Sequence, residues 1–406
     1  MMAKQDSKIQ FARRLDGVSE SATLKLNATV QAMKAQGLNV VNLTAGEPDF
    51  APPEVAKQAL IDALEANRSK YTPVAGIPEL REAVAAKTNA QHSALSKAQP
   101  WKASHVVVTN GGKQALFNAC LALLDPGDEV LIPSPYWLSY PEMVKLAGGI
   151  PKFISASADQ GFKIGPKQLK AALGPKVKLL ILNSPSNPTG ALYSQPEYAA
   201  LAQVLLDSPE AQNVWVISDE IYDRIILGAR PFCSFLQAAP ALRDRTVTIN
   251  GMSKSAAMTG WRIGWSVATE GITQAMTTLQ GQSTSGINSL AQWASLAALK
   301  LPESHFSAQV EHYKQRQNIL LKVLQKSRKL KVVAPDGAFY AFVGVGSYLR
   351  PGEDSIEFAQ RLLEEARVAV VPGTPFGEPE FVRLSFATDE KILQEGCERF
   401  VQYLGE

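Results

Sequence analysis

Short apolar runs that alternate with longer amphipathic stretches constrain the fold of this chain more than any other feature. The runs are rich in Val and Ile and end close to Gly, Pro, Asn or Asp, as buried strands do. They are Val106–Thr109, Val130–Ile132, Leu179–Leu182, Trp215–Ser218 and Thr246–Ile249. The amphipathic stretches include Gln114–Leu124, Gln195–Leu206 and Asn288–Leu299. This alternation predicts an α/β fold in which helices flank a mostly parallel central sheet.

The pattern changes after about residue 309. A long charged stretch, Val310–Ser327, has helical spacing, and two later segments, GAFYAFV and FVRLSFA, are typical of antiparallel strands. We therefore expect a large domain over residues 50–309 and a smaller α+β domain. The smaller domain would combine residues 310–406 with the N-terminal segment 1–49.

Composition excludes several classes of protein. The chain has 406 residues, is 46% hydrophobic and 19% charged, and carries a net charge of only +3, so we expect neither nucleic acid nor a membrane surface as a partner. Three scattered cysteines and four histidines without ligand spacing predict neither a disulfide framework nor a metal site. The first 17 residues lack the apolar core of a secretory signal. A cytoplasmic enzyme is the expectation.

A polar cluster follows each of four predicted strands. The clusters are residues 110–114, 183–190, 219–222 and 250–254. Each alone has an ordinary explanation, because Gly forms turns, Asp219 and Glu220 suit a helix N-terminus, and a loop lysine is usually solvated. Parallel strands, however, present their carboxyl ends at one edge, where ligands bind. Together the clusters predict a ligand site at that edge.

A phosphate group fits part of this site. The Gly111-Gly112 turn can present backbone N–H groups and a helix N-terminus, and Arg262 can grip the same phosphate with two hydrogen bonds. A nucleoside-triphosphate loop is excluded, because position 107 is not glycine and Gln114 stands where Ser or Thr is needed.

Nine segments, in order and nearly from end to end, carry a family resemblance. They are LTAGEPDF (43–50), KYTPVAGIPELR (70–81), TNGGKQALFN (109–118), SPYWLSYPEM (134–143), NSPSNPTGALY (183–193), VISDEIYD (216–223), SKSAAMTGWRIGW (253–265), GAFY (337–340) and VRLSFA (382–387). The chain resembles the class I, fold-type I aminotransferases that use pyridoxal 5′-phosphate, nearest to the bacterial aspartate aminotransferase branch. The resemblance implies amino-group transfer between an L-amino acid and a 2-oxo acid by a ping-pong mechanism.

The resemblance also implies roles at the cofactor ring. Lys254 would bind the cofactor as a Schiff base and would move the proton during catalysis. Asp219 would pair with the ring nitrogen, and Tyr222 and Asn187 would hydrogen-bond the phenolic oxygen of the ring. Trp137 would stack on the ring face.

The phosphate and the substrate carboxylate would be bound by further residues. Gly111, Gly112 and Arg262, with Ser253 beside them, would hold the phosphate. Arg383 would bind the substrate α-carboxylate, close to the backbone of Gly46 and to the Trp137 and Asn187 side chains. Tyr71 would reach the phosphate of a neighbouring subunit, so the resemblance implies a homodimer with shared active sites.

Substrate specificity is less constrained. Residues 263–299 contain no Lys or Arg, so the arginine that some aspartate aminotransferases place there is absent. Lys113 would instead bind the distal carboxylate of aspartate or glutamate, or would only neutralise the phosphate. Relatives that accept prephenate are expected to carry a basic residue where this chain has Ser19, which argues against prephenate.

Other functions remain open on the same scaffold, because a fold does not fix a reaction. Prephenate, aromatic or neutral amino acids are alternative substrates, and a β-lyase, a cyclopropane-forming synthase or a decarboxylase is an alternative enzyme. A transcription regulator that senses the cofactor is also possible in principle. It would need a DNA-binding domain, and only 42 residues, not strongly basic, precede LTAGEPDF.

Overall fold

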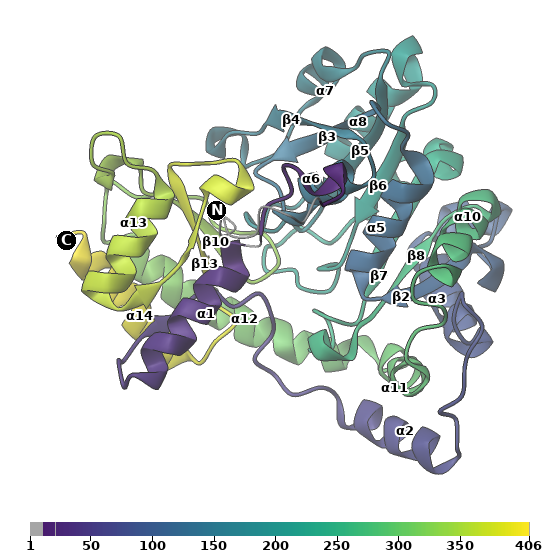
Figure 1. The fold of residues 1–406 in the computed structure, drawn as a ribbon, viewed down its shortest axis with the longest axis horizontal. Coiled ribbons are helices and arrows are strands. Elements are labelled where there is room, and N and C mark those ends of the chain that lie inside the picture. The colour runs from purple at the N-terminus through teal and green to yellow at the C-terminus, as the bar shows by residue number, and fades with distance from the viewer. Residues whose placement is uncertain (1–10, 21, 406) are drawn as a thin grey trace.

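A seven-stranded sheet forms the centre of the larger part of the molecule (Figure 1). The computed structural model describes residues 11–20 and 22–405; the first ten residues of the predicted small domain and Ser21 lie outside them. The strand order is β2-β8-β7-β6-β5-β3-β4, and β8 alone runs antiparallel to its neighbours. The strands are β2 (Val106–Asn110), β3 (Glu129–Ser134), β4 (Ile150–Ser155), β5 (Val177–Asn183), β6 (Trp215–Asp219), β7 (Thr246–Gly251) and β8 (Ile263–Val267).

All five predicted strands are present, and the α/β prediction with a mostly parallel sheet is confirmed. Two strands of this seven-stranded sheet, β4 and β8, were not predicted. β4 is an edge strand that contains Pro151 and Lys152 and exposes Phe153, so it lacks the apolar run of a buried strand. β8 begins at Ile263, directly after Arg262, so no turn residue separates the strand from the segment before it in the sequence.

Alternating side chains of the strands build two cores, one on each face of the sheet. On one face Ile132 and Ile181 pack against α5 (Gly112–Leu123), α6 (Ser139–Leu146) and α10 (Glu270–Gly281). On the other face Leu131 and Leu180 pack against α7 (Pro166–Ala172) and α8 (Gln195–Asp207). Neighbouring residues of one strand thus face opposite cores, as the period of two requires.

This part has further helices, and those labelled in Figure 1 lie on its right side and at its lower edge. The further helices are α2 (Glu54–Glu65), α3 (Pro78–Gln91), α4 (Ser93–Ala98), α9 (Phe235–Ala238) and α11 (Ser289–Leu299). Val106 and Val108 of β2 lie in a third apolar cluster with residues of α3 and α11.

The C-terminal part contains a second, four-stranded sheet in the order β12-β13-β10-β9. Its strands are β9 (Lys331–Val332), β10 (Tyr340–Gly344), β12 (Val371–Pro372) and β13 (Phe381–Ser385), and its helices are α12 (Glu303–Leu324), α13 (Ser355–Arg361) and α14 (Glu390–Tyr403). β10 and β13 pair antiparallel, as their sequences predicted. α12 begins at Glu303 rather than near residue 310, because Pro302 precedes it and its first turns are mostly polar and hide the helical period.

The N-terminal segment joins this second part. β1 (Val41–Asn42) pairs in parallel with β11 (Val368–Ala369), and Val30 of α1 (Ala22–Ala35) lies in one apolar cluster with Ala369 of β11. Figure 1 shows α1 against the C-terminal part. Arg316 of α12 also makes two hydrogen bonds to Asp49, which fix the end of the segment. These contacts support the two predicted domains, whose boundaries stay a prediction. No helix within residues 11–20 and 22–405 is long and apolar enough to span a bilayer.

Candidate active site

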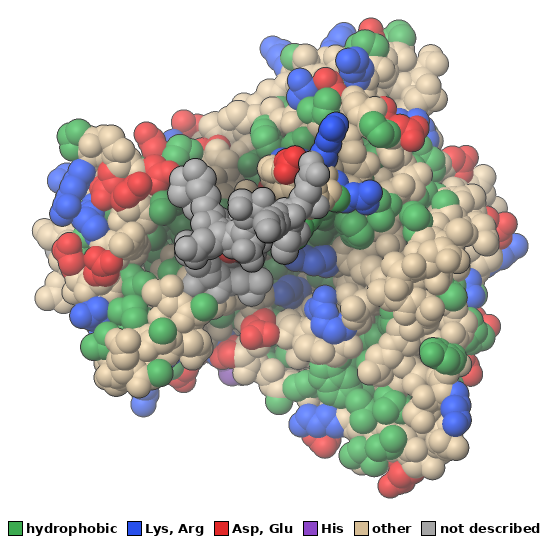
Figure 2. Space-filling model, in the orientation of Figure 1, with side chains coloured by type: hydrophobic (Ala, Val, Ile, Leu, Met, Phe, Trp, Pro, Cys, Tyr) green, Lys and Arg blue, Asp and Glu red, His purple; other side chains and the backbone are tan. Residues whose placement is uncertain are grey.

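A cavity of about 440 Å³ lies between the carboxyl edge of the large sheet and the smaller part of the molecule. Lys and Arg side chains gather in the hollow at the centre of the face drawn in Figure 2. The side chains and backbone that line the cavity come from both parts. They are Gly46, Gly112, Lys113, Leu116, Trp137, Leu138, Ser139, Tyr140, Asn183, Asn187, Asp219, Ile221, Tyr222, Ser253, Lys254, Thr259, Arg262, Tyr340 and Arg383.

The structure thus brings together all the predicted site residues except two. Gly111 does not line the cavity, although it adjoins Gly112, which does. Tyr71 lies outside the cavity, and its side chain is 99% exposed among the residues that the structure describes.

Lys254 lies in the middle of the cavity, in the loop after β7. Its half-buried amine donates a hydrogen bond of 2.5 Å to the backbone oxygen of Gly46, in the N-terminal segment. Burial lowers the pKa of Lys254 to about 8, with Glu47 acting in the opposite direction and Arg383 lowering it further. A larger fraction of neutral amine at neutral pH makes this lysine a better nucleophile and base than a solvated one.

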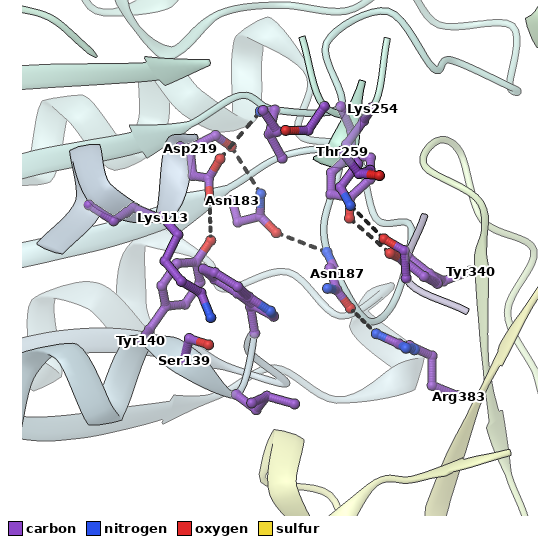
Figure 3. A pocket seen from close by; sticks show the side chains of 18 of the residues that line it. Lys113, Ser139, Tyr140, Asn183, Asn187, Asp219, Lys254, Thr259, Tyr340 and Arg383 are labelled. Carbon is purple, nitrogen blue, oxygen red and sulfur yellow. Dashed lines mark hydrogen bonds between the residues drawn. The ribbon is translucent and has the colours of Figure 1, made fainter. Parts of the chain in front are cut away.

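One end of the cavity holds a buried carboxylate (Figure 3). Asp219 is the last residue of β6, and the hydroxyl of Tyr140 donates a hydrogen bond of 2.7 Å to its Oδ2. Burial raises the pKa of Asp219 to about 6, although this hydrogen bond opposes the shift. Asn183 donates to the backbone oxygen of Asp219 and accepts from the backbone N–H of Asn187. The acid is fixed in place by neutral groups.

The opposite end holds a buried guanidinium (Figure 3). Arg383 is 2% exposed; its Nη1 donates to Oδ1 of Asn187 at 2.9 Å and its Nη2 to the backbone oxygen of Thr44 at 3.0 Å. Within the described part of the chain it forms no ion pair, and its Nε has no hydrogen-bond partner. Burial lowers the pKa of Arg383. A buried cation with neutral partners is poorly compensated, so this end is suited to bind an anion.

A phosphate-sized anion fits a third position, at the start of α5. Gly111 is the N-cap of this helix and has a φ of +79°, and a Cβ there would lie 2.6 Å from Nη2 of Arg262. Only glycine lets the backbone lie so close to the guanidinium, which donates to the backbone oxygens of Thr259 and Asn110. The N–H groups of the first helical turn and the guanidinium therefore point to the same anion site.

Lys113 extends from this helix turn over Trp137, with its Nζ 4.9 Å from the ring centroid. Burial lowers the pKa of Lys113, and nearby Arg262 lowers it further. Its amine is therefore placed at the cavity wall, where it can approach either the phosphate position or a substrate.

The lining residues that the sequence analysis missed include three polar ones that hydrogen-bond to predicted site residues: Tyr140, Asn183 and Tyr340. Asn183 was part of a noted cluster but received no role. Tyr140 and Tyr340 lie in two of the nine family segments, yet an aromatic residue in a helix or an apolar strand resembles any core residue. Only the chain's three-dimensional packing shows that their hydroxyls face Asp219 and Tyr222.

The residues fit pyridoxal 5′-phosphate. The helix start beside Arg262 suits its phosphate, Asp219 its ring nitrogen, Lys254 its aldehyde, and Trp137 its flat face. Two observations support this fit. The charged and polar side chains of the cavity match the groups of the cofactor, and a Cβ at position 111 would clash with the guanidinium of Arg262, so the close approach needs glycine there.

Comparisons with known proteins agree with this fit. A family model described as aminotransferase class I and II matches residues 39–400. A probable aspartate/prephenate aminotransferase from Rhizobium leguminosarum bv. phaseoli is 41% identical over 97% of this chain and 98% of its own length. The aspartate aminotransferase of Bacillus subtilis is 39% identical over 98% of this chain and 99% of its own.

Two solved structures are similar along nearly the whole chain. The aspartate aminotransferase of Rhizobium meliloti has a TM-score of 0.92 and 39% identity, covering 98% of this chain and 99% of its own. The Thermus thermophilus aspartate aminotransferase with maleate has a TM-score of 0.89 and 41% identity, covering 97% of this chain and 99% of its own.

Proposed function

The chain belongs to the class I and II aminotransferases, and we propose that it transfers the amino group of L-aspartate or L-glutamate to a 2-oxo acid. It is a transferase that depends on pyridoxal 5′-phosphate. The observation that carries the substrate proposal is the pair of cations in the cavity lining: Arg383 for the α-carboxylate that every amino acid has, and Lys113 for the second carboxylate of aspartate or glutamate.

The cofactor, when bound, supplies an aldehyde that reacts with amines and a ring that accepts the electron pair left on Cα. Asp219 would hold a proton on the ring nitrogen, because a carboxylate in a dry site stabilises an adjacent cation. Lys254 would take the proton from Cα and return it to the neighbouring carbon of the ring system.

The other residues would orient the substrate. Arg383 would bind the α-carboxylate with two hydrogen bonds and so fix which bond of Cα is broken. Trp137 would limit the ring on one face, and Ser253 and Gly112 would support the phosphate with Arg262. Gly46 lies in the N-terminal segment and accepts a hydrogen bond from Lys254 of the large domain, so this segment would cover the bound substrate and exclude water.

A distal carboxylate would bind Lys113, the cation on the cavity wall beside Trp137. Prephenate is a weaker candidate substrate than aspartate or glutamate, although one relative is named a probable aspartate/prephenate aminotransferase. Ser19 supplies no positive charge, and its backbone N–H donates to Glu142 of α6. The alternative use of Lys113, phosphate neutralisation, predicts equal effects on all substrates.

A spectroscopic experiment tests the reaction type. Adding L-aspartate alone to the loaded enzyme should change the cofactor spectrum in one half-reaction, and catalytic release of oxaloacetate should require a second 2-oxo acid. Given a β-substituted amino acid such as cysteine, a β-lyase would instead release 2-oxo acid, ammonia and the β-substituent without an acceptor, and that result would overturn the proposal.

A second experiment tests the substrate. We expect Lys113→Ala to lower kcat/KM for aspartate about 10-fold more than kcat/KM for leucine, because a charged hydrogen bond contributes about 1.5–3 kcal/mol. Lys167→Ala is the matched control, since Lys167 is also the second residue of a helix but lies away from the cavity. An equal fall in kcat/KM for aspartate and for leucine would mean that Lys113 only neutralises the cofactor phosphate.

We also propose a cytoplasmic homodimer with shared sites. Helix α2 exposes Val55, Ile61 and Leu64 by about half, Tyr71 follows this helix in the chain, and apolar side chains gather at the lower edge of Figure 2. Mixed refolding of the inactive variants Tyr71→Ala and Lys254→Ala should restore part of the activity, because one site of each mixed dimer would be intact. Failure to complement would count against sharing.

A further inference from the structure

Tyr340 has no role in the proposed reaction so far, although its side chain lies in the cavity wall. It is the first residue of β10 and faces Ser385 of β13 in the antiparallel register, so Arg383 is its diagonal neighbour on the same face. The guanidinium of Arg383 consequently lies over the Tyr340 ring, 4.4 Å from its centroid (Figure 3). The tyrosine thus contacts the residue that would bind the substrate carboxylate.

The hydroxyl of Tyr340 contacts a second active-site residue. It lies 3.0 Å from the hydroxyl of Tyr222, which comes from the other part of the molecule, after β6. The two rings are nearly perpendicular, at 81°, and both side chains are buried, with exposures of 0% and 3%. Water therefore cannot replace this hydrogen bond easily.

The direction of the hydrogen bond follows from proton counting. A phenol has one proton to donate but can also accept. If Tyr222 donates its proton to the ring oxygen of the cofactor, the proton between the two hydroxyls must come from Tyr340. The positive charge of Arg383 over the Tyr340 ring makes this phenol a stronger donor.

Resting on the proposed function, we propose that Tyr340 is a positioning residue, whose hydroxyl donates to Tyr222 and thereby orients and strengthens the hydrogen bond from Tyr222 to the cofactor. Consecutive hydrogen bonds polarise one another, so removing the first donor weakens the second bond. Tyr340 in this way connects the carboxylate end of the cavity to the electronic state of the cofactor.

The test is a pH titration of the visible absorbance of the cofactor-loaded enzyme. We expect Tyr340→Phe to move the midpoint upward by about 0.5 pH unit, because a weaker donor at the ring oxygen lets the bound group keep its proton to higher pH. Tyr222→Phe should move it further in the same direction. The double variant should match Tyr222→Phe alone, since Tyr340 acts through Tyr222.

Tyr313→Phe is the matched control. Tyr313 is buried in the same apolar cluster, and its hydroxyl has no hydrogen-bond partner among the described residues. Its loss should leave the midpoint unchanged. Tyr340→3-fluorotyrosine, which keeps the shape and strengthens the donor, should move the midpoint downward, and it decides the question if Tyr340→Phe does not fold.

Steady-state kinetics separate the hydroxyl from the ring. Tyr340→Phe keeps the ring under Arg383, so KM for the amino donor should stay within about 2-fold while kcat falls about 3-fold to 10-fold. Tyr340→Leu removes the ring and should also raise KM, because the guanidinium loses its flat support.

Two results would overturn the inference: an unchanged midpoint in Tyr340→Phe, or shifts of Tyr340→Phe and Tyr222→Phe that simply add. Failure of the proposed function is seen separately, because wild-type enzyme would then show no spectral change with an amino donor. A normal wild-type half-reaction with an unchanged Tyr340→Phe midpoint rejects only the role of Tyr340.

Discussion

The two ends of the cavity hold buried charges of opposite sign that are supported in different ways. Asp219 is held by Tyr140 and by Asn183, which belong to the same large sheet and the helices that cover it. Arg383 is held by Asn187 from the large part, by Thr44 from the N-terminal segment, and by Tyr340 of its own sheet. All the contacts of Asp219 therefore come from the large part, whereas the contacts of Arg383 come from the large part, the N-terminal segment and the C-terminal part together.

This difference matches the order in which ligands would be used. The cofactor stays bound through many turnovers, and its ring nitrogen would need a carboxylate in a constant position. The substrate carboxylate enters and leaves in each half-reaction, and a site assembled between units can open and close. The following changes test this contrast, beginning with the residue between the two ends.

Removing the Lys254 amine should abolish turnover whichever end of the cavity is intact. We expect Lys254→Ala to fold but to lose turnover by about 10³-fold or more, because both covalent binding and proton transfer depend on this amine. Transamination rate and thermal unfolding measure the two properties. Lys163→Ala, at a half-buried lysine outside the cavity, should keep its rate; near-normal transamination in Lys254→Ala would contradict the site.

At the acid end, Asp219→Asn should lower kcat about 10²-fold to 10³-fold with little change in KM, because an amide cannot stabilise a protonated ring nitrogen. Steady-state kinetics with aspartate at several concentrations give both constants. A rise in KM as large as the fall in kcat would mean that this carboxylate binds substrate, and the two ends would no longer differ.

At the arginine end, Arg383→Lys should act mainly on KM, lowering kcat/KM about 10²-fold, because an ammonium cannot replace the two parallel hydrogen bonds of a guanidinium. Cofactor affinity should stay unchanged. Arg361→Lys is the control, since Arg361 also makes two hydrogen bonds to a carboxylate but lies away from the cavity. A large loss of cofactor in Arg383→Lys would show that the ends are not separate.

Tyr140→Phe should have a smaller effect than Asp219→Asn. Loss of the hydroxyl donor raises the pKa of Asp219 further, so the carboxylate competes for the proton and kcat should fall about 10-fold. Tyr193→Phe removes another buried hydroxyl, which accepts from the backbone N–H of Ile164, and should leave kcat unchanged. Equal effects of the two variants would reduce Tyr140 to a packing residue.

The smallest expected effect concerns stability and pH. Because burial holds the pKa of Lys254 at about 8, below its ordinary 10.5, the unfolded chain binds more protons than the folded chain between these values. The unfavourable contribution of this lysine is thus complete below pH 8 and disappears as pH rises toward 10.5. Cofactor-free Lys254→Met should be more stable than wild type by on the order of 1 kcal/mol at pH 7.

Urea unfolding of both proteins at pH 7 and at pH 10 measures this difference, which should shrink at the higher pH. A difference that is the same at both pH values would show that packing of the methionine, and not the buried charge, causes it.

Much of the fold and the chemistry could be predicted from the sequence because strand ends mark the site. Lys254 and Asp219 follow apolar runs, so their position at the sheet edge was predictable, and Arg383 lies in an alternating strand motif. Tyr140 and Tyr340 could not be given roles, since hydrogen bonds between distant segments leave no local pattern. The antiparallel direction of β8 was hidden for the same reason, because register is set by contacts with β2 and β7.

The pairing of β1 with β11 has a consequence for synthesis of the protein. Val41 is made early, but its partner Val368 emerges from the ribosome only when the chain is almost complete. Until then Val41 and Leu43 lack the part of their core that β11, β13 and α14 supply, while the seven-stranded sheet, whose strands end at Val267, already has all its strands. The residues that support Asp219 are therefore all made before Arg383, and the apolar N-terminal segment lacks its partner strand through most of synthesis, when chaperones can bind such segments.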